Sequence, residues 1–218
     1  MLMHIYIEFV NEIKINDRKI IDNLNNKILQ GYNCKYYTDE GETTWSDETM
    51  ADINLVRFEK NRHHRIQIYN TGMSLYYNNL ILSLKNPDVT SFVATIMDNI
   101  MQYYKRLGLI IDNIKIPIQY SESVADKLYP CKAFMENGYS FTSNVDLGYH
   151  FRASKDNCTY VFDMESIYKK GLTDIDKVKC NIFMERKTNS IQDPLLVKQF
   201  ILDTPNEFNK FKSILLQK

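Results

Sequence analysis

The sequence predicts an α+β fold, in which largely antiparallel or mixed sheets are packed by a long central helix and two C-terminal helices. Strand-like segments occur in runs between helices, whereas the strict strand–helix alternation typical of parallel sheets is missing. Apolar residues at helical spacing continue through about five turns over residues 88–107. Two helix-start signals follow near the C-terminus, at Asp193-Pro194 and at Thr204-Pro205.

The length of 218 residues fits one large domain or two small lobes. Both halves of the chain place strands before their main helices, which favours an N-terminal α/β lobe over residues 1–120. A C-terminal lobe of a β-hairpin and helices then occupies residues 121–218. Two α/β sandwich lobes and a single domain both remain compatible with this pattern.

Residues 3–15 alternate between apolar and polar side chains, which predicts a half-buried strand with one wet face. Residues 17–30 change to helical spacing, with Asn16 as a cap and Gly31 as a left-handed stop. The polar, acidic residues 32–51 predict a long loop or a weak hairpin.

Residues 52–84 predict a meander of strands that includes a tight turn at Asn78-Asn79. The central helix over 88–107 ends at Gly108, and a strand over 109–120 follows. Pro117 has no backbone N–H, so we expect this strand to be an edge or to contain a bulge.

The C-terminal half predicts a short helix and loop at 122–138, a hairpin at 139–164 and one helical turn at 165–171. Residues 174–186 fit either a strand or a helix. The final helix, over 204–216, has a capping box at Thr204 and Glu207. We expect it to dock through an apolar stripe of Phe208, Phe211, Ile214 and Leu215.

Several classes of function are disfavoured by what the sequence lacks. It contains neither a glycine-rich dinucleotide motif nor a P-loop, and it has no nucleophile elbow. No two of the cysteines Cys34, Cys131, Cys158 and Cys180 are closer than 22 residues, which excludes paired zinc motifs and favours four reduced thiols over two disulfides. The net charge of zero argues against a protein that coats nucleic acid.

The composition also bears on origin and location. The chain has 24 Ile, 21 Asn and 20 Lys, but only 5 Ala and 7 Arg, which favours an A+T-rich genome such as that of a virus, a phage, a mobile element or a low-GC bacterium. The N-terminal residues lack the basic region of a signal peptide, and no apolar run approaches the length of a membrane span. We therefore expect a cytoplasmic protein of the bacterium or of an infected host, without a membrane partner.

The sharpest candidate for chemistry is Asp163 with Glu185 and Lys187. Metal-dependent nucleases place an acid on one strand and an E-x-K motif on the next, where two carboxylates hold Mg²⁺ and the lysine orients the attacking water. Both acids follow apolar runs, so we expect them at strand ends. The alternative is that they are two surface acids, since E-x-K is common by chance in a chain rich in Lys and Glu.

A second candidate is the basic run Arg62, His63, His64 and Arg65, which could contact an RNA backbone because it combines permanent cations with titratable imidazoles. The alternative is an exposed hairpin tip.

Taken together, these observations predict a non-enzymatic binding protein, an assembly or regulatory factor that works as a subunit of a complex and needs no cofactor. The partner is expected to be a protein or a second copy of the chain, with nucleic acid as a further option. Fifteen tyrosines support an interface, because tyrosine is enriched at protein–protein contacts. The strand with Pro117 and the first strand are the candidate docking edges. The alternatives are a nuclease that binds Mg²⁺ through Asp163 and Glu185 and an RNA-binding module.

Overall fold

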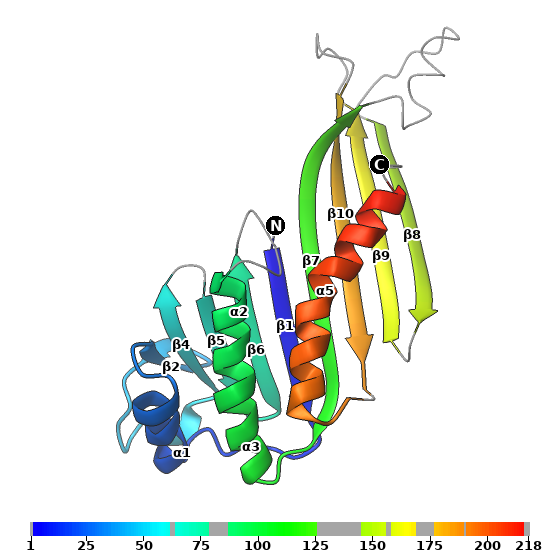
Figure 1. The fold of residues 1–218 in the computed structure, drawn as a ribbon. Helices are drawn as coiled ribbons and strands as arrows, with labels where there is room; N and C mark the ends of the chain where they lie inside the picture. Colours follow the sequence, from blue (N-terminus) through cyan, green and yellow to red (C-terminus); the bar gives the residue numbers. More distant parts are fainter. Residues whose placement is uncertain are drawn as a thin grey trace, which may run out of the picture.

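The computed structural model describes residues 2–61, 64–78, 87–125, 145–155, 158–168, 177–189 and 191–215. In this part of the chain, ten strands form one sheet, and every neighbouring pair is antiparallel (Figure 1). The strands are β1 (Leu2–Phe9), β2 (Asn33–Thr38), β3 (Gly41–Thr43), β4 (Leu55–Asn61), β5 (His64–Tyr69), β6 (Gly72–Asn78), β7 (Ile111–Ala125), β8 (Val145–Lys155), β9 (Cys158–Tyr168) and β10 (Lys177–Thr188). Their order across the sheet is β3-β2-β4-β5-β6-β1-β7-β10-β9-β8.

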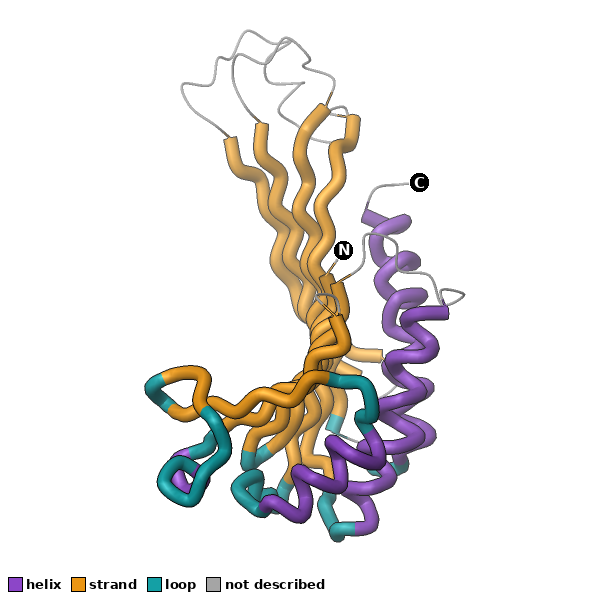
Figure 2. Tube along the Cα trace, turned by 90° about the vertical axis from the view of Figure 1, so that its left-hand side faces the viewer, coloured by secondary structure: helices purple, strands orange, loops and turns teal. Residues whose placement is uncertain are grey.

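The main helices form a second layer against one face of this sheet (Figure 2). They are α1 (Arg18–Asn23), the π-helical segments η1 (Leu24–Ile28) and η3 (Thr95–Met101), α2 (Pro87–Ala94), α3 (Gln102–Arg106) and α5 (Pro194–Leu215), and a short 3₁₀ turn, η2 (Met50–Asp52), precedes β4. The helix α5 packs against α2 and η3 and reaches strands β7 and β10. The mixed α+β class expected from the sequence is therefore confirmed, although the sheet dominates.

Side-chain alternation explains why only one face of the sheet is covered. In β1, the side chains of Met3, Ile5 and Ile7 are fully buried beneath the helices, whereas the positions between them are polar. The same alternation continues in β7, where Ile114, Ile116 and Ile118 are buried. Because successive side chains of a strand point to opposite faces, the polar positions face away from the helices.

Glycine is required where β6 approaches β1 most closely. Gly72 lies opposite Glu8, and a Cβ atom at this position would collide with the carbonyl oxygen of Ile7. Gly31 and Gly108 have positive φ angles after η1 and α3, as expected for helix stops. The helix start is shifted by one residue, since the carboxylate of Asp17, rather than Asn16, accepts a hydrogen bond from the Lys19 N–H.

The predicted docking edges are wrong, because β1 and β7 are central strands. Strand β1 lies between β6 and β7, and β7 lies between β1 and β10. Pro117 is accommodated by a local break, since the β1–β7 register has pairs at Met3 and Tyr6 but none at His4 and Ile5. The missing proline N–H thus interrupts the ladder with β1, while Pro117 keeps its place opposite Glu185 of β10.

The helices differ from expectation in two places. Residues 87–106 form the consecutive segments α2, η3 and α3, with a π-helical middle, instead of one long regular central helix. At the C-terminus a single helix, α5, continues through Pro205, so the two predicted C-terminal helices are one. Thr204 is not a cap but an interior residue, and its hydroxyl donates to the carbonyl of Phe200 at 2.7 Å.

Three further segments of the C-terminal half are extended rather than helical. Strand β7 runs on to Ala125, β9 runs on to Tyr168, and the ambiguous residues 174–186 contribute to strand β10. The hairpin of β8 and β9 is confirmed. The rest of the predicted helix at 122–138 and the turn at Asn78-Asn79 reach beyond the described residues.

Strand β7 crosses the lobe boundary predicted at residues 120 and 121, and it joins the two halves of the sheet. Within the described residues Cys34 takes part in no disulfide. None of the helices in the described part of the chain has both the length and the apolar character needed to cross a membrane.

Candidate functional site: the open face of the sheet

The candidate site lies on the sheet face opposite the helices, which we call the open face. No described helix covers this face (Figure 2). Its side chains come from alternate positions of β2, β4, β5, β6, β1, β7, β10, β9 and β8. It carries two neighbouring groups. The aromatic–arginine cluster consists of His4, Tyr6, Tyr37, Arg57, Arg65 and Tyr76, and the charged cluster consists of Glu8, Asn113, Lys115, Arg152, Glu185 and Lys187.

Stacking contacts hold the aromatic–arginine cluster together at β5, β6 and β1. The guanidinium of Arg65 lies 4.4 Å from the centroid of the Tyr76 ring. The His4 ring meets Tyr76 edge-on, with centroids 4.8 Å apart, and the Tyr6 hydroxyl lies 3.2 Å from His4 Nδ1. Register explains this grouping, because His4 pairs with Tyr76 and Arg65 pairs with Tyr76 on its other side.

A second arginine–tyrosine contact lies further along the same face. The Arg57 guanidinium stacks 4.4 Å from the Tyr37 ring centroid and donates a hydrogen bond to the Tyr37 hydroxyl at 2.9 Å. Arg57 also lies 3.6 Å from the carboxylate of Glu59. Each arginine is therefore fixed against an aromatic ring.

Electrostatics keep His4 neutral within this cluster. Burial of the ring, and then the positive charge of Arg65, lower the pKa of His4 below its usual value. At neutral pH the imidazole therefore offers one donor and one acceptor rather than a charge.

The charged cluster begins with a carboxylate that already has partners. Glu8 accepts hydrogen bonds from the Asn113 amide and from Lys115, with the Lys115 contact at 3.1 Å. Partial burial opposes ionisation, but these two hydrogen bonds and the charges of Lys115 and Lys187 hold the pKa of Glu8 below its usual value. Asn113 is buried, and its Oδ1 atom has no hydrogen-bond partner among the residues that the structure describes.

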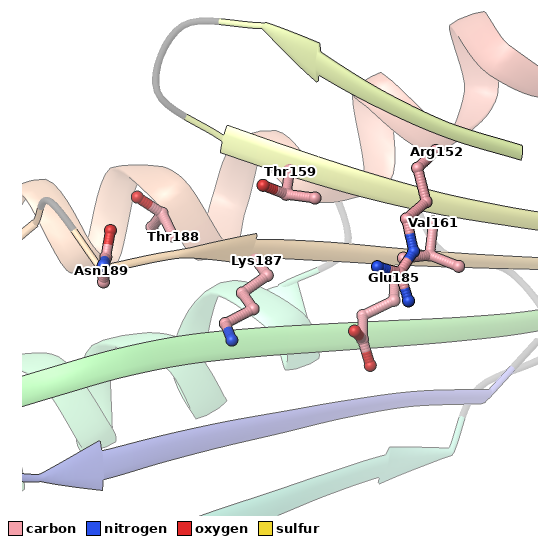
Figure 3. A pocket seen from close by; sticks show the side chains of 7 residues that line it. All are labelled: Arg152, Thr159, Val161, Glu185, Lys187, Thr188 and Asn189. Atoms are coloured by element: carbon pink, nitrogen blue, oxygen red, sulfur yellow. The ribbon is translucent and has the colours of Figure 1, made fainter.

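The charged cluster continues into a pocket of about 360 Å³ over β8, β9 and β10 (Figure 3). It is lined by Arg152, Thr159, Val161, Glu185, Lys187, Thr188 and Asn189. Lys187 and Glu185 extend from β10 in the direction of β7, and Arg152 reaches over from β8. Within the described residues, no side-chain hydrogen bond or ion pair is formed by Arg152, Glu185 or Lys187.

The backbone register brings the predicted metal-site residues near one another. The β9–β10 ladder pairs Asp163 with Phe183 and Val161 with Glu185, so Asp163 and Glu185 are diagonal neighbours on adjacent strands. Such diagonal positions lie about 7–8 Å apart. The side chain of Asp163 lies outside the described side chains, whereas Glu185 and Lys187 both line the pocket.

Neither acid lies at a strand end, contrary to expectation. Asp163 is in the middle of β9, and Glu185 is followed by three more residues of β10. Among the described residues, no group of three or more His, Cys, Asp or Glu side chains is placed to hold a metal ion.

The predicted basic run does not form one surface. His64 lies on the helix side, with its ring stacked on Tyr77 at 5.2 Å and on Phe92 at 5.0 Å between centroids. Its neighbour Arg65 lies on the open face. Arg62 and His63 lie outside the described residues, so RNA binding by all four residues stays a prediction.

Sequence reasoning missed most of the open face. It recognised that His4 and Glu8 alternate with buried residues, but it did not connect them to Tyr76, Arg65 or Lys115. Local alternation could have identified these residues as outward-facing one strand at a time. Their grouping needed the strand order, which places β1 between β6 and β7.

Comparisons of this chain with protein-family models, with curated protein sequences and with solved structures find no match.

Proposed function

We propose that the protein is a non-enzymatic binding protein, an assembly or regulatory factor that docks a protein partner on the open face of its sheet. The observation that supports this most is the aromatic–arginine cluster, which lies on a face that no described helix covers. Tyrosine and arginine are enriched at protein interfaces and among the residues that dominate binding energy. Tyr6 is 38% exposed. Burial of its ring by a partner would contribute favourably to the free energy of binding.

The charges of this face favour a partner surface that carries carboxylates. Arg65 and Lys187 make no ion pair within the described residues, whereas the carboxylate of Glu8 is already bound by Lys115. A carboxylate on the partner could therefore accept hydrogen bonds from guanidinium groups that are already oriented. Arginines stacked on rings lose less conformational freedom on binding, which supports specificity.

Capture experiments with face-specific variants test this proposal. The immobilised wild-type chain is compared with Arg65→Glu and Lys187→Glu on the open face, and with Lys105→Glu and Arg106→Glu as matched exposed controls on α3. We expect the two open-face variants to lose most of the protein captured from a lysate of the source cells, while both α3 variants retain it. Equal capture by all variants, or selective loss with the α3 variants, would contradict the proposal.

A second function is favoured by one observation, the diagonal register of Asp163 and Glu185 beside the pocket that Lys187 lines. Two carboxylates and a lysine on adjacent strands are the residues that a Mg²⁺-dependent nuclease uses. In that case Asp163 and Glu185 would hold the ion, and Lys187 would orient the attacking water.

Incubation of plasmid DNA and RNA with the protein in Mg²⁺ or Mn²⁺ separates the two functions. Nuclease activity requires cleavage that Asp163→Ala, Glu185→Ala and Lys187→Ala each abolish and that the exposed-loop control Glu48→Ala retains. Absence of cleavage, or cleavage that survives Glu185→Ala, excludes the nuclease and leaves the docking function as the better account.

A further inference from the structure

Strand β8 forms one end of the sheet, and its outer edge pairs with none of the described residues. It is 11 residues long, whereas β3 at the opposite end has only 3 residues. The side chains from Arg152 to Lys155 are exposed. A long edge strand presents a row of unpaired N–H and C=O groups, which is a template for pairing with another strand.

Register with β9 shows which face each residue of β8 occupies. Arg152 pairs with Val161 and lines the pocket on the open face. Ala153 pairs with Tyr160, which is buried on the helix side near Arg186. Even-numbered positions of β8 therefore belong to the open face, and odd-numbered positions belong to the helix side.

A second copy of the chain can extend the sheet only in certain registers. A two-fold axis perpendicular to the sheet keeps the helices of both copies on one side, and it pairs even positions with even positions. The axis must therefore pass through a residue of β8 rather than between two residues.

In one such register, a negatively charged residue lies opposite a positively charged residue of the second copy. With the axis at Tyr149, Asp146 is opposite the partner's Arg152, and this pair occurs twice by symmetry. The same register places Leu147 opposite the partner's Phe151, which matches apolar positions on the helix side. Moving the axis to His150 places Arg152 opposite the partner's Gly148 and removes the charge match.

We propose that the chain forms a symmetric dimer in which β8 pairs antiparallel with the β8 strand of a second copy, about an axis at Tyr149. Arg152, which makes no ion pair within the described residues of its own chain, receives the partner's Asp146 as its counter-ion. This surface is an edge of the sheet and goes beyond the docking proposed for the open face. A single strand pair is smaller than a standard interface of about 1,600 Å², so the dimer dissociates on dilution.

Charge reversal tests the register directly. In sedimentation velocity runs over a concentration series, the wild-type chain is expected to show a reversible monomer–dimer equilibrium. Asp146→Arg and Arg152→Asp should each weaken dimerisation by about tenfold or more, because each places two like-charge pairs across the axis. An equimolar mixture of the two variants should dimerise about as well as the wild type, because both cross-axis pairs in the mixed dimer are then of opposite charge.

Disulfide trapping provides a second readout that does not depend on charge. Residues opposite each other in an antiparallel pair have Cα atoms about 4.5–5.5 Å apart, which is within disulfide range. Tyr149→Cys should therefore form a covalent dimer under mild oxidation, beyond the background of the wild-type chain. Ala153→Cys is the matched control, because its two copies would lie about 27 Å apart along the strands.

Three results would overturn the proposal. The first is a wild-type chain that stays monomeric at the highest concentration. The second is a mixture of the charge variants that dimerises no better than either variant alone. The third is covalent dimer formation that is as efficient at position 153 as at position 149. Because the capture experiment uses Arg65 and Lys187, failure of the dimer leaves the docking function untouched, and the reverse also holds.

Discussion

Arg186 and Lys187 are neighbours in the sequence, but they face opposite sides of β10. Arg186 donates hydrogen bonds to the Phe200 carbonyl at 3.0 Å and to the Thr204 hydroxyl at 3.1 Å, and its guanidinium lies 4.1 Å from the Phe200 ring centroid. Arg186 therefore stabilises the packing of α5 on the sheet. Lys187 instead lines the pocket on the open face.

We expect Arg186→Met to lower the free energy of unfolding by about 2 kcal/mol, because two hydrogen bonds from a charged donor are lost. Lys187→Met, the matched neighbour, should change it by less than about 0.5 kcal/mol. Urea denaturation at neutral pH measures both values. Similar losses for the two variants would show that β10 does not present these residues to different faces.

Glu8 should contribute to the pH dependence of stability. Its pKa in the folded protein lies below the ordinary value of 4.5, so the stabilisation is present above that value and is lost as the pH falls through the folded pKa. The gain is about 1 kcal/mol or less, because 44% of the side chain is exposed and solvent screens its ion pair with Lys115.

Glu8→Gln should therefore be slightly less stable than the wild type at pH 7, and the difference should disappear in strong acid. Urea denaturation of both chains at a series of pH values measures this. A difference that grows as the pH falls would mean that the folded pKa of Glu8 is raised rather than lowered.

At the scale of elements, the sequence predicted the features of strands and helices that depend on the local spacing of residue types. The alternation of β1 and the glycine stops at Gly31 and Gly108 were visible without a structure. Proline caused the main errors. Pro205 suggested a new helix, but the packing of Phe200 and Phe208 on either side of it carries α5 straight through. Pro117 suggested an edge, but pairing on both sides overrides the loss of one N–H.

Two residues of the expected apolar stripe in the C-terminal half of α5 are part of the core, whereas Ile214 and Leu215 lie outside the described side chains. Phe208 and Phe211 are buried, and Phe208 packs against Tyr120 of β7 with ring centroids 6.0 Å apart. A chain that ends at Asp203 loses both phenylalanines, at about 1.5–3 kcal/mol each. Its melting temperature should therefore fall by about 10 °C or more.

Circular dichroism melts of the full chain and of the truncated chain measure this effect. A chain that ends at Leu215 is the control and should melt like the full chain, because it keeps both aromatic residues. If the chain ending at Asp203 also melts unchanged, α5 does not depend on these contacts.

At the scale of the whole molecule, strand order brings the open face together, and order cannot be predicted from local periodicity. Glu8 and Lys115 are more than a hundred positions apart, and their side chains lie 3.1 Å apart because β1 pairs with β7. The sequence did single out Glu185 and Lys187, which the structure places in one pocket. It could not indicate that His64 and Arg65 face opposite sides, because the predicted turn at that point hid the start of β5.

The central claim is that the open face, rather than the helix layer, receives a protein partner. Cross-linking of the captured complex with an amine-reactive reagent, followed by mass spectrometry, tests it most directly. Lys35, Lys115 and Lys187 report on the open face, and Lys105, Lys198 and Lys210 report on the helix side. We expect cross-links to the partner to concentrate on the first three lysines. Cross-links that concentrate on the last three would contradict the account.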